Sequence, residues 1–210
     1  MKTKWEMALR SHFSFLQEDI MNLRLRKYNI SKESKDKVKE LYFSAFPKDE
    51  QLPYWMMKLL SRKKSADFYS IYDKKDFVGL AYVATYKDTA YLFFFAIDEK
   101  QRGKGYGSAF LSALKEKYKN YRILLAIEQL DQNAPNIDER IKRKNFYTKN
   151  GFYDLNFTMT EQSVTYDMLG YNKDNKTVTE KEFFYLNKNF FGKIFYNLFY
   201  KRIYVEPRDV

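Results

Sequence analysis

A glycine-rich turn is the stretch of this sequence whose residue types and spacing most clearly indicate chemistry. It reads Arg102-x-x-Gly105-x-Gly107, with a further glycine at Gly103, and it stands between an apolar run and a helical pattern. Glycine lets the backbone adopt unusual dihedral angles and approach a ligand closely. A strand, such a turn and a helix start direct several backbone N–H groups towards one point, which suits a phosphate. The turn therefore predicts a phosphate-bearing ligand.

The turn does not select a fold by itself, because many loops use glycine only for their shape. It lacks the G-x-G-x-x-G spacing of dinucleotide-binding folds. It also lacks the lysine followed by serine or threonine that marks the phosphate loop of many nucleotide hydrolases. The strands and helices around the turn therefore distinguish between the remaining folds.

Strand-like segments surround the turn and predict a mixed sheet. They are short, apolar or alternating, and rich in β-branched and aromatic residues. They cover residues 23–28, 68–72, 77–86, 89–97, 122–129, 152–159 and 164–171. Short links make the segments from 68 to 97 an antiparallel meander, which argues against a Rossmann unit. A helix separates 89–97 from 122–129, so these two strands are predicted to be parallel neighbours joined by a right-handed crossover.

Helical patterns complete an α+β fold whose mixed sheet of six to seven strands is flanked by helices. Ser31 can cap a helix that Pro47 ends, and Pro53 suits the first turn of another. Further helices are expected directly after the glycine-rich turn and over residues 138–149. A capping box at Thr179-x-x-Glu182 opens a last, Phe-rich helix to about residue 200. Its apolar stripe covers either a core or a subunit partner, or, as a basic amphipathic helix, lies on a membrane surface.

The composition excludes several classes of site. The chain of 210 residues has no cysteine, which excludes a disulfide framework, a thiolate metal site and a cysteine nucleophile. Its single histidine, His12, supports neither a histidine-rich metal cluster nor a Ser-His-Asp triad, so no metal is expected. No apolar run approaches the ~18–20 residues of a membrane-spanning helix, and the charged N-terminus is unlike a secretory signal. We expect a cytoplasmic protein.

The net charge of +11 has two interpretations. It can indicate an acidic partner such as nucleic acid, an anionic surface or a phosphorylated cofactor. It can equally reflect a lysine-rich solvated surface, because the basic residues are spread along the chain without one dense tract. No zinc-finger or RNA-binding signature accompanies them.

A second motif lies downstream of the turn, at the predicted end of the helix over residues 138–149. It reads Tyr147-x-x-x-Gly151-Phe152, and one strand and one helix separate it from Arg102-x-x-Gly105-x-Gly107. Together the two motifs resemble those of the GNAT superfamily of acetyl-CoA-dependent N-acetyltransferases. The order of elements over residues 23–171 also fits that family. The resemblance implies a GNAT domain over residues 21–172, an N-terminal extension over residues 1–20 and a C-terminal helical extension over residues 173–210.

The resemblance also implies where acetyl-CoA binds as the acyl donor. Its pantetheine arm would pair in strand fashion with Phe95, Ala96 and Ile97, and an N–H near Ile97 would hold the thioester oxygen. Its pyrophosphate would lie on the backbone amides of the turn, which comprises Arg102, Gly103, Lys104, Gly105, Tyr106, Gly107 and Ser108.

Two side chains are candidates for proton transfer. Attack on the thioester needs a neutral amine, whereas an alkylammonium with a pKa near ~10.4 is protonated at neutral pH. Glu128, towards the end of its strand, would take that proton directly or through water; alternatively, it positions the substrate or pairs with a nearby Arg or Lys. In the family a tyrosine at the position of Tyr147 protonates the departing thiolate. With 19 tyrosines in the chain, the alternative is a structural role.

One residue departs from the family pattern. Many relatives have Asn seven residues before the motif tyrosine, where this chain has Arg140. With Arg143 and Lys144, it would either meet phosphates of CoA or be solvated. The family's acceptor pocket corresponds to the surroundings of four aromatic residues that can equally be core, namely Trp55, Tyr69, Tyr82 and Tyr166.

The predicted function is transfer of an acetyl group from acetyl-CoA to a primary amine of a small molecule or peptide, by direct attack in a ternary complex. One alternative is a catalytically weak GNAT-like module that binds nucleic acid or an anionic surface. Another is an acetyltransferase acting on a large acidic partner such as tRNA or a ribosomal component, which ranks lower because no platform of aromatic and basic residues is identifiable. A homodimer is considered as a further partner.

Overall fold

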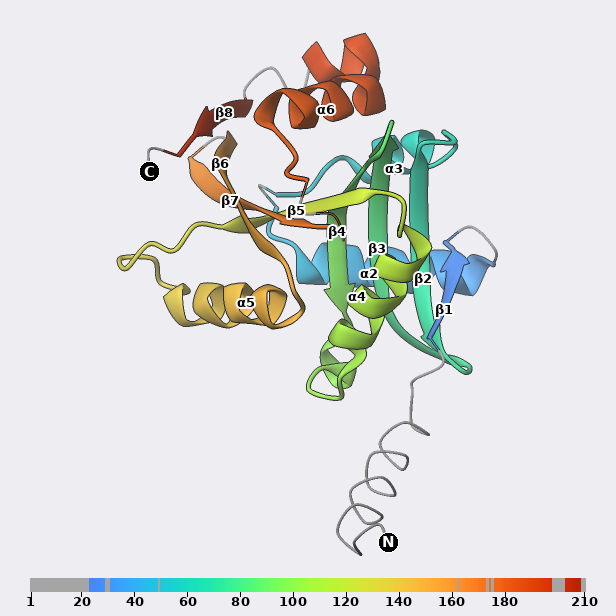
Figure 1. The fold of residues 1–210 in the computed structure, drawn as a ribbon. Helices are drawn as coiled ribbons and strands as arrows, with labels where there is room; N and C mark the ends of the chain where they lie inside the picture. The colour runs from blue at the N-terminus through green and yellow to red at the C-terminus, as the bar shows by residue number, and fades with distance from the viewer. Residues whose placement is uncertain are drawn as a thin grey trace, which may run out of the picture.

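The computed structural model of the chain describes residues 23–28, 31–48, 50–161, 163–172, 174, 176–197 and 203–208. The extension predicted for residues 1–20 lies outside these ranges. The described chain forms an eight-stranded mixed sheet with helices on both faces (Figure 1). Its strands are β1 (Leu23–Lys27), β2 (Ala66–Asp73), β3 (Asp76–Tyr86), β4 (Thr89–Ile97), β5 (Arg122–Glu128), β6 (Tyr153–Glu161), β7 (Val164–Tyr171) and β8 (Ile203–Pro207). Its α-helices are α2 (Lys32–Ala45), α3 (Tyr54–Leu60), α4 (Tyr106–Lys117), α5 (Ile137–Lys149) and α6 (Glu180–Phe195).

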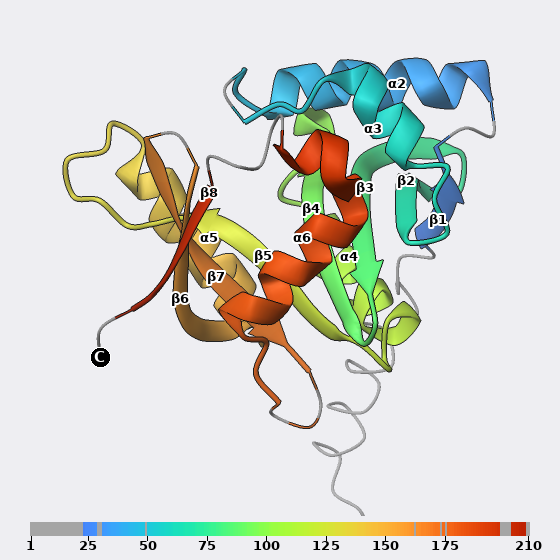
Figure 2. The same ribbon diagram turned by 90° about the horizontal axis from the view of Figure 1, so that it is seen from above.

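Different helices cover the two faces of the sheet, as the two ribbon views show (Figures 1 and 2). On one face α2, α3 and α6 bury Tyr42 and Phe190 against strand residues such as Tyr82. On the other face α4 and α5 form a second core, in which Phe110 packs with Val83. Successive residues of one central strand thus belong to different cores. This double burial explains why the central segments are almost wholly apolar instead of alternating.

The order of strands in the sheet is β1-β2-β3-β4-β5-β7-β6-β8. The first four strands pair antiparallel, which confirms the predicted meander. β4 and β5 are parallel neighbours across α4, which confirms the predicted crossover connection. α4 therefore begins at the end of β4, where the glycine-rich turn lies.

β4 and β5 separate soon after they meet. Their parallel pairing ends with Tyr91 of β4. Against β3, Leu92 and Phe94 face consecutive residues, so that Phe93 is an extra residue, a β-bulge. A bulge bends its strand and increases the local twist. The second half of β4 keeps its partner in β3, while its other edge is left without a strand.

The C-terminal segment packs on the same sheet. The capping box predicted at Thr179 and Glu182 is present, and α6 buries Phe183 and Phe190 in the core against the sheet. The interpretation of its apolar stripe as a cover for a core is therefore confirmed. α6 ends at Phe195 after an interruption at Gly192, and the predicted end near residue 200 lies outside the described residues.

β8 was not predicted from the sequence. It pairs antiparallel with β6 and extends the sheet to eight strands, against the expected six to seven. Among the residues that the structure describes, no helix is long and apolar enough to cross a membrane.

Candidate active site

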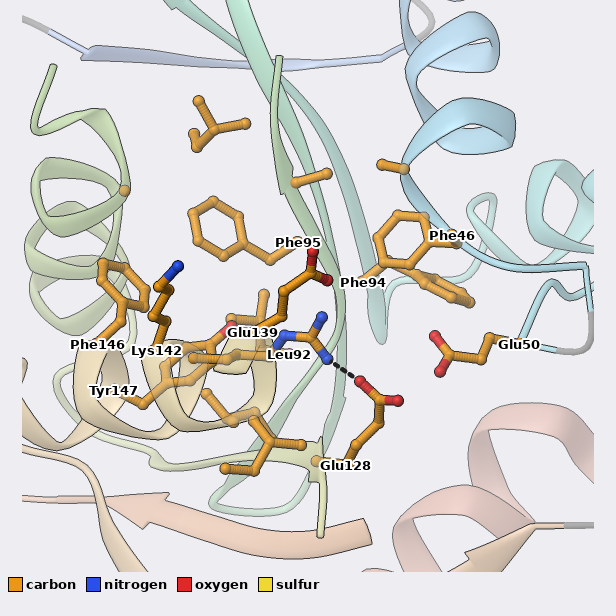
Figure 3. A pocket seen from close by; sticks show the side chains of 18 of the residues that line it. Phe46, Glu50, Leu92, Phe94, Phe95, Glu128, Glu139, Lys142, Phe146 and Tyr147 are labelled. Atoms are coloured by element: carbon orange, nitrogen blue, oxygen red, sulfur yellow. Dashed lines mark hydrogen bonds and ion pairs between the residues drawn. The ribbon is translucent and has the colours of Figure 1, made fainter. Parts of the chain in front are cut away.

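A cleft of about 1050 Å³ opens where β4 and β5 separate. The glycine-rich turn and α5 form one side, and Phe146, Lys142 and Tyr147 lie there (Figure 3). Phe46 and Glu50, from the segment that ends α2 and precedes α3, form the opposite side (Figure 3). Residues of β4, β5, β6 and β7 line the cleft between these two sides. The cleft therefore joins segments from both faces of the sheet.

The turn presents the N-terminus of α4 to the cleft. Gly105 is the N-cap of this helix and has a left-handed backbone with φ of 85°, which explains the need for glycine there. No side chain caps the helix, and the first N–H groups of a helix have no acceptor within the helix. These N–H groups and the positive end of the helix dipole favour an anion at the turn, so the predicted phosphate site stays a prediction that this geometry suits.

The second glycine of the turn serves close packing. A Cβ atom added at Gly107 would lie 3.0 Å from the ring of Phe146 on α5. Glycine therefore lets the start of α4 approach α5 beside Tyr147. The contact between Gly107 and Phe146 thus holds the glycine-rich turn close to the candidate catalytic tyrosine.

The predicted cofactor-binding residues lie together in the cleft, with one exception. Nine of the ten line it: Phe95, Ala96, Ile97, Arg102, Gly103, Gly105, Tyr106, Gly107 and Ser108. Lys104 does not line the cleft, because its ammonium group donates to the Gln101 side chain at 2.9 Å. Phe95, Ala96 and Ile97 pair with β3 on one edge and face the cleft with the other. That open edge can accept an extended ligand arm in strand fashion.

The motif around Tyr147 is a helix-ending structure. Phe152 N donates to Tyr147 O at 3.1 Å, and Gly151 N donates to Thr148 O at 2.9 Å. Gly151 has φ of 78°, so this is a Schellman motif in which glycine supplies the left-handed residue. The rings of Tyr147 and Phe152 pack with centroids 5.7 Å apart, the hydrophobic contact that accompanies such an ending. The spacing Tyr-x-x-x-Gly-Phe thus fixes the position of Tyr147.

The Tyr147 side chain is buried and still lines the cleft. Burial raises its pKa to about 12, and the charge of Arg143 opposes this shift. The hydroxyl therefore remains protonated at neutral pH. Among the described residues no hydrogen-bond partner of this hydroxyl is found, which leaves it able to donate to a ligand in the cleft.

Glu128 lies on the wall of the cleft but is held by ion pairs. Its carboxylate lies 3.1 Å from the Arg140 guanidinium and pairs also with Arg143. Asn136 Nδ2 donates to it at 3.2 Å. Two guanidinium groups thus lie against this one carboxylate. This is the pairing that the alternative interpretation of Glu128 anticipated.

The basic residues of α5 have structural partners. Arg140 donates to Gln129 O at 2.7 Å and to Asn136 Oδ1 at 2.8 Å, in addition to its contact with Glu128. Lys144 pairs with the buried carboxylate of Asp167 at 3.1 Å. The expectation that these side chains meet CoA phosphates or are solvated was therefore wrong for Arg140 and Lys144. Both fasten α5 to the sheet.

A family model matches the part of the chain that contains both motifs. The model described as "Acetyltransferase (GNAT) domain" matches residues 64–154, which include the turn at Gly105 and the motif at Tyr147. This part of the chain is a GNAT-type domain. This domain is that of an acyltransferase. No curated protein matches the chain.

Solved structures share the GNAT fold at low sequence identity. A protein of Bacteroides thetaiotaomicron described as a GNAT-family acetyltransferase is 20% identical over 82% of this chain and 98% of that one, with a TM-score of 0.60. An aminoglycoside 6'-N-acetyltransferase complexed with coenzyme A is 13% identical over 72% and 96%, with a TM-score of 0.57. The ribosomal-protein-S18-alanine N-acetyltransferase of Escherichia coli is 14% identical over 74% and 99%, with a TM-score of 0.53.

The aromatic residues suggested for the GNAT acceptor pocket divide into two groups. Tyr166 lines the cleft, and its hydroxyl donates to Glu50 Oε1 at 3.2 Å. Tyr69 and Tyr82 are buried, and Trp55 is exposed and packs on Phe195. Only Tyr166 lies in the cleft.

Sequence reasoning missed three carboxylates in the cleft, Glu50, Glu139 and Glu161, of which Glu50 and Glu161 lie close enough to interact. Glu161 is the last residue of β6, and it stands next to the predicted terminal turn, where a charged residue is unremarkable. Burial, followed by repulsion from Glu50, raises the pKa of Glu161 to about 7. No local pattern could have found this pair, because their segments meet only in the folded sheet.

Proposed function

We propose that the chain transfers an acetyl group from acetyl-CoA to a primary amine of a small molecule or peptide, with both substrates bound at once. One observation carries the proposal: the cleft joins the N-terminus of α4, the open edge of β4 and the Tyr147 hydroxyl. These three features fit, in this order, the pyrophosphate, the pantetheine arm and the thioester sulfur of acetyl-CoA.

The turn and the strand would position the donor. The amides of residues 102–108 would bind the pyrophosphate, with Gly105 setting their direction. The open edge of Phe95, Ala96 and Ile97 would hold the arm and direct the thioester carbonyl to the centre of the cleft.

Tyr147 would act on the departing sulfur. A phenol with a pKa of about 12 is a weaker acid than a thiol with a pKa of ~8.5. Complete proton transfer from Tyr147 to the thiolate would therefore be unfavourable. We propose that the hydroxyl donates a hydrogen bond that stabilises charge on the sulfur as the carbon–sulfur bond breaks.

Amine acceptors are supported by what the similar structures are called. Their names include an aminoglycoside N-acetyltransferase, a ribosomal-protein alanine N-acetyltransferase and a spermidine N-acetyltransferase. A turnover screen with acetyl-CoA against aminoglycosides, polyamines, amino acids and peptides with free N-termini tests the proposal. We expect CoA release that depends on one class of amine. Absence of amine-dependent CoA release across the whole screen, at any pH, would argue against it.

A further inference from the structure

We propose that Glu161 is the group that accepts the proton of the attacking amine, in place of Glu128. The inference rests on the acetyl transfer proposed above and names a catalytic residue for it. Both carboxylates line the same cleft. They differ in their surroundings, and the difference determines which of them can take up a proton.

Glu128 is poorly suited to accept a proton. Arg140 and Arg143 pair with its two carboxylate oxygens, and its side chain is only 11% exposed. A proton taken up by Glu128 would break two ion pairs and leave guanidinium groups without their counter-charge. Through these ion pairs Glu128 links β5 to α5.

Glu161 has the opposite surroundings. None of the ion pairs found among the described residues includes it. Three groups interact electrostatically with Glu161. They are Glu50 from the segment before α3, Tyr91 of β4 and Tyr166 of β7. Tyr166 also responds to the charge of Glu128, which pairs with two arginines. The carboxylate is thus partly buried beside another acid, and a proton relieves both the burial and the repulsion.

Glu50 and Tyr166 support this role from the same part of the cleft wall. The Tyr166 hydroxyl donates to Glu50, which fixes the two side chains relative to each other beside Glu161. An alkylammonium that enters the cleft from this side would meet the charge of Glu50 and Glu161 together. The same wall would therefore attract the cationic form of the substrate and remove its proton.

The chemical step balances as follows. The Glu161 carboxylate takes one proton from the ammonium nitrogen and becomes a carboxylic acid. The nitrogen lone pair forms a bond to the thioester carbon, and the carbon–sulfur bond breaks as the thiolate leaves. The nitrogen then releases a second proton, which the thiolate takes up to give the free thiol. Glu161 returns its proton to water, so that one proton is released to solvent in each turnover.

The pH dependence of kcat tests the inference, measured with the best amine of the screen from about pH 5.5 to about 9.5. For the wild type we expect kcat to rise as pH passes about 7, where Glu161 loses its proton. Glu161→Gln should lose this limb, and kcat should fall about 100-fold at neutral pH. Acetyl-CoA affinity should change by less than about twofold, because Glu161 lies away from the turn.

Three matched variants separate this role from a packing role. Glu161→Asp should keep an ionising limb and recover part of the rate. Glu50→Gln should move the limb to lower pH, because it removes a charge that opposes ionisation of Glu161. Glu128→Gln should keep an ionising limb, because Glu161 is still present.

Thermal unfolding gives a readout that does not depend on turnover. Glu161 binds a proton more tightly in the folded protein than in the unfolded chain, where its carboxyl has the ordinary pKa of 4.5. The stabilisation from this proton is present at low pH and is lost as pH rises from about 4.5 through about 7. Glu161→Gln should therefore raise the Tm relative to wild type at pH above about 7.5, and should do so much less at pH near 5.

The outcomes are distinguishable. If the wild type turns over an amine and Glu161→Gln keeps both the wild-type rate and the wild-type limb, the inference is overturned while the proposed function stands. If the wild type turns over no amine at any pH, the proposed function fails and the inference falls with it.

Discussion

At the scale of single residues, the spacing of each motif follows from backbone geometry as much as from chemistry. Gly151 ends α5 in a left-handed conformation, and Phe152 packs on Tyr147 across that ending. Gly105 starts α4 in the same conformation, and Gly107 admits the ring of Phe146. The two motifs therefore fix the ends of two helices that meet at the cleft.

Tyr147→Phe tests the proposed contact with the sulfur. The variant keeps the ring that packs on Phe152 and removes only the hydroxyl, so the fold should be unaffected. We expect kcat to fall by about 100-fold, the size of one lost transition-state hydrogen bond. Acetyl-CoA binding, measured by calorimetry, should change by less than about threefold. Equal losses in kcat and in binding would instead indicate a packing role.

A substitution at Gly107 tests the contact between the turn and α5. Gly107→Ala places a Cβ atom 3.0 Å from the Phe146 ring, which must then move. We expect both weaker acetyl-CoA binding and a lower kcat, because the turn and Tyr147 share this contact. The double variant Gly107→Ala/Phe146→Leu should recover part of both. If Gly107→Ala alone kept the wild-type acetyl-CoA affinity and the wild-type kcat, this would contradict the coupling between the turn and Tyr147.

The residue scale also shows where prediction from sequence reached its limit. Tyr147 and the residues of the turn other than Lys104 lie together in the cleft, because their patterns are local and depend on glycine; their roles stay predictions. Arg140 was misjudged, because its partners Gln129 and Glu128 come from another element. Glu161 was missed for the same reason, since its neighbours Glu50 and Tyr91 are distant in sequence.

At the scale of elements, hydrophobic spacing and end signals predicted the helices and the first seven strands. The β-bulge at Phe93 and strand β8 were not predicted. A bulge depends on register with the neighbouring strand, which no single segment encodes. β8 is five residues long and ends in Pro207, so that only its pairing with β6 identifies it as a strand.

The docking of α6 on the sheet can be tested by two phenylalanines on the same helix. Phe190 is 1% exposed and packs on Tyr82, whereas Phe184 is 40% exposed. Phe190→Ala should lower the free energy of unfolding by about 3–5 kcal/mol, as the loss of a buried aromatic ring does. Phe184→Ala should lower it by no more than about 0.5 kcal/mol. Denaturant unfolding measures both, and similar losses would mean that α6 does not pack as described.

An ion-pair network fixes the start of α6. Arg122 lies 2.6 Å from Glu182 and 2.8 Å from Asp88. Hydrogen bonding to Arg122 lowers the pKa of Glu182 to about 2, so the stabilisation is present above pH 4.5 and is lost as pH falls towards 2. Glu182→Gln should therefore lower the Tm at neutral pH but not at pH near 2. Because the side chain is partly exposed, we expect a loss of about 1 kcal/mol at most.

At the scale of the whole molecule, the separation of β4 from β5 opens the cleft to segments from both faces of the sheet. α4 and α5 reach it from one face, and the segment that follows α2 reaches it from the other (Figure 2). The donor would bind on the α4 and α5 side and the amine on the side of Glu50 and Glu161. We propose that the described residues 176–197 and 203–208, which belong to the segment first treated as an extension, fold as one unit with the GNAT domain, because α6 and β8 pack on its sheet.

The net charge of +11 is an excess of basic over acidic side chains that internal ion pairs do not reduce. Several basic side chains are engaged in ion pairs within the fold, among them Arg122, Arg140 and Lys144. Under the present proposal the anionic ligand is the phosphorylated donor.

Binding of acetyl-CoA tests the central claim most directly. The thermal unfolding of the wild type should be followed with rising acetyl-CoA, with acetylated pantetheine as the matched ligand that lacks the nucleotide and its pyrophosphate. A ligand at 100 times its Kd stabilises the folded state by about 2.7 kcal/mol. We predict a saturable rise in Tm with acetyl-CoA and a much smaller one with acetylated pantetheine at equal concentration. No rise at millimolar acetyl-CoA, or equal rises with both ligands, would contradict the assignment of the turn at Gly105 as the pyrophosphate site.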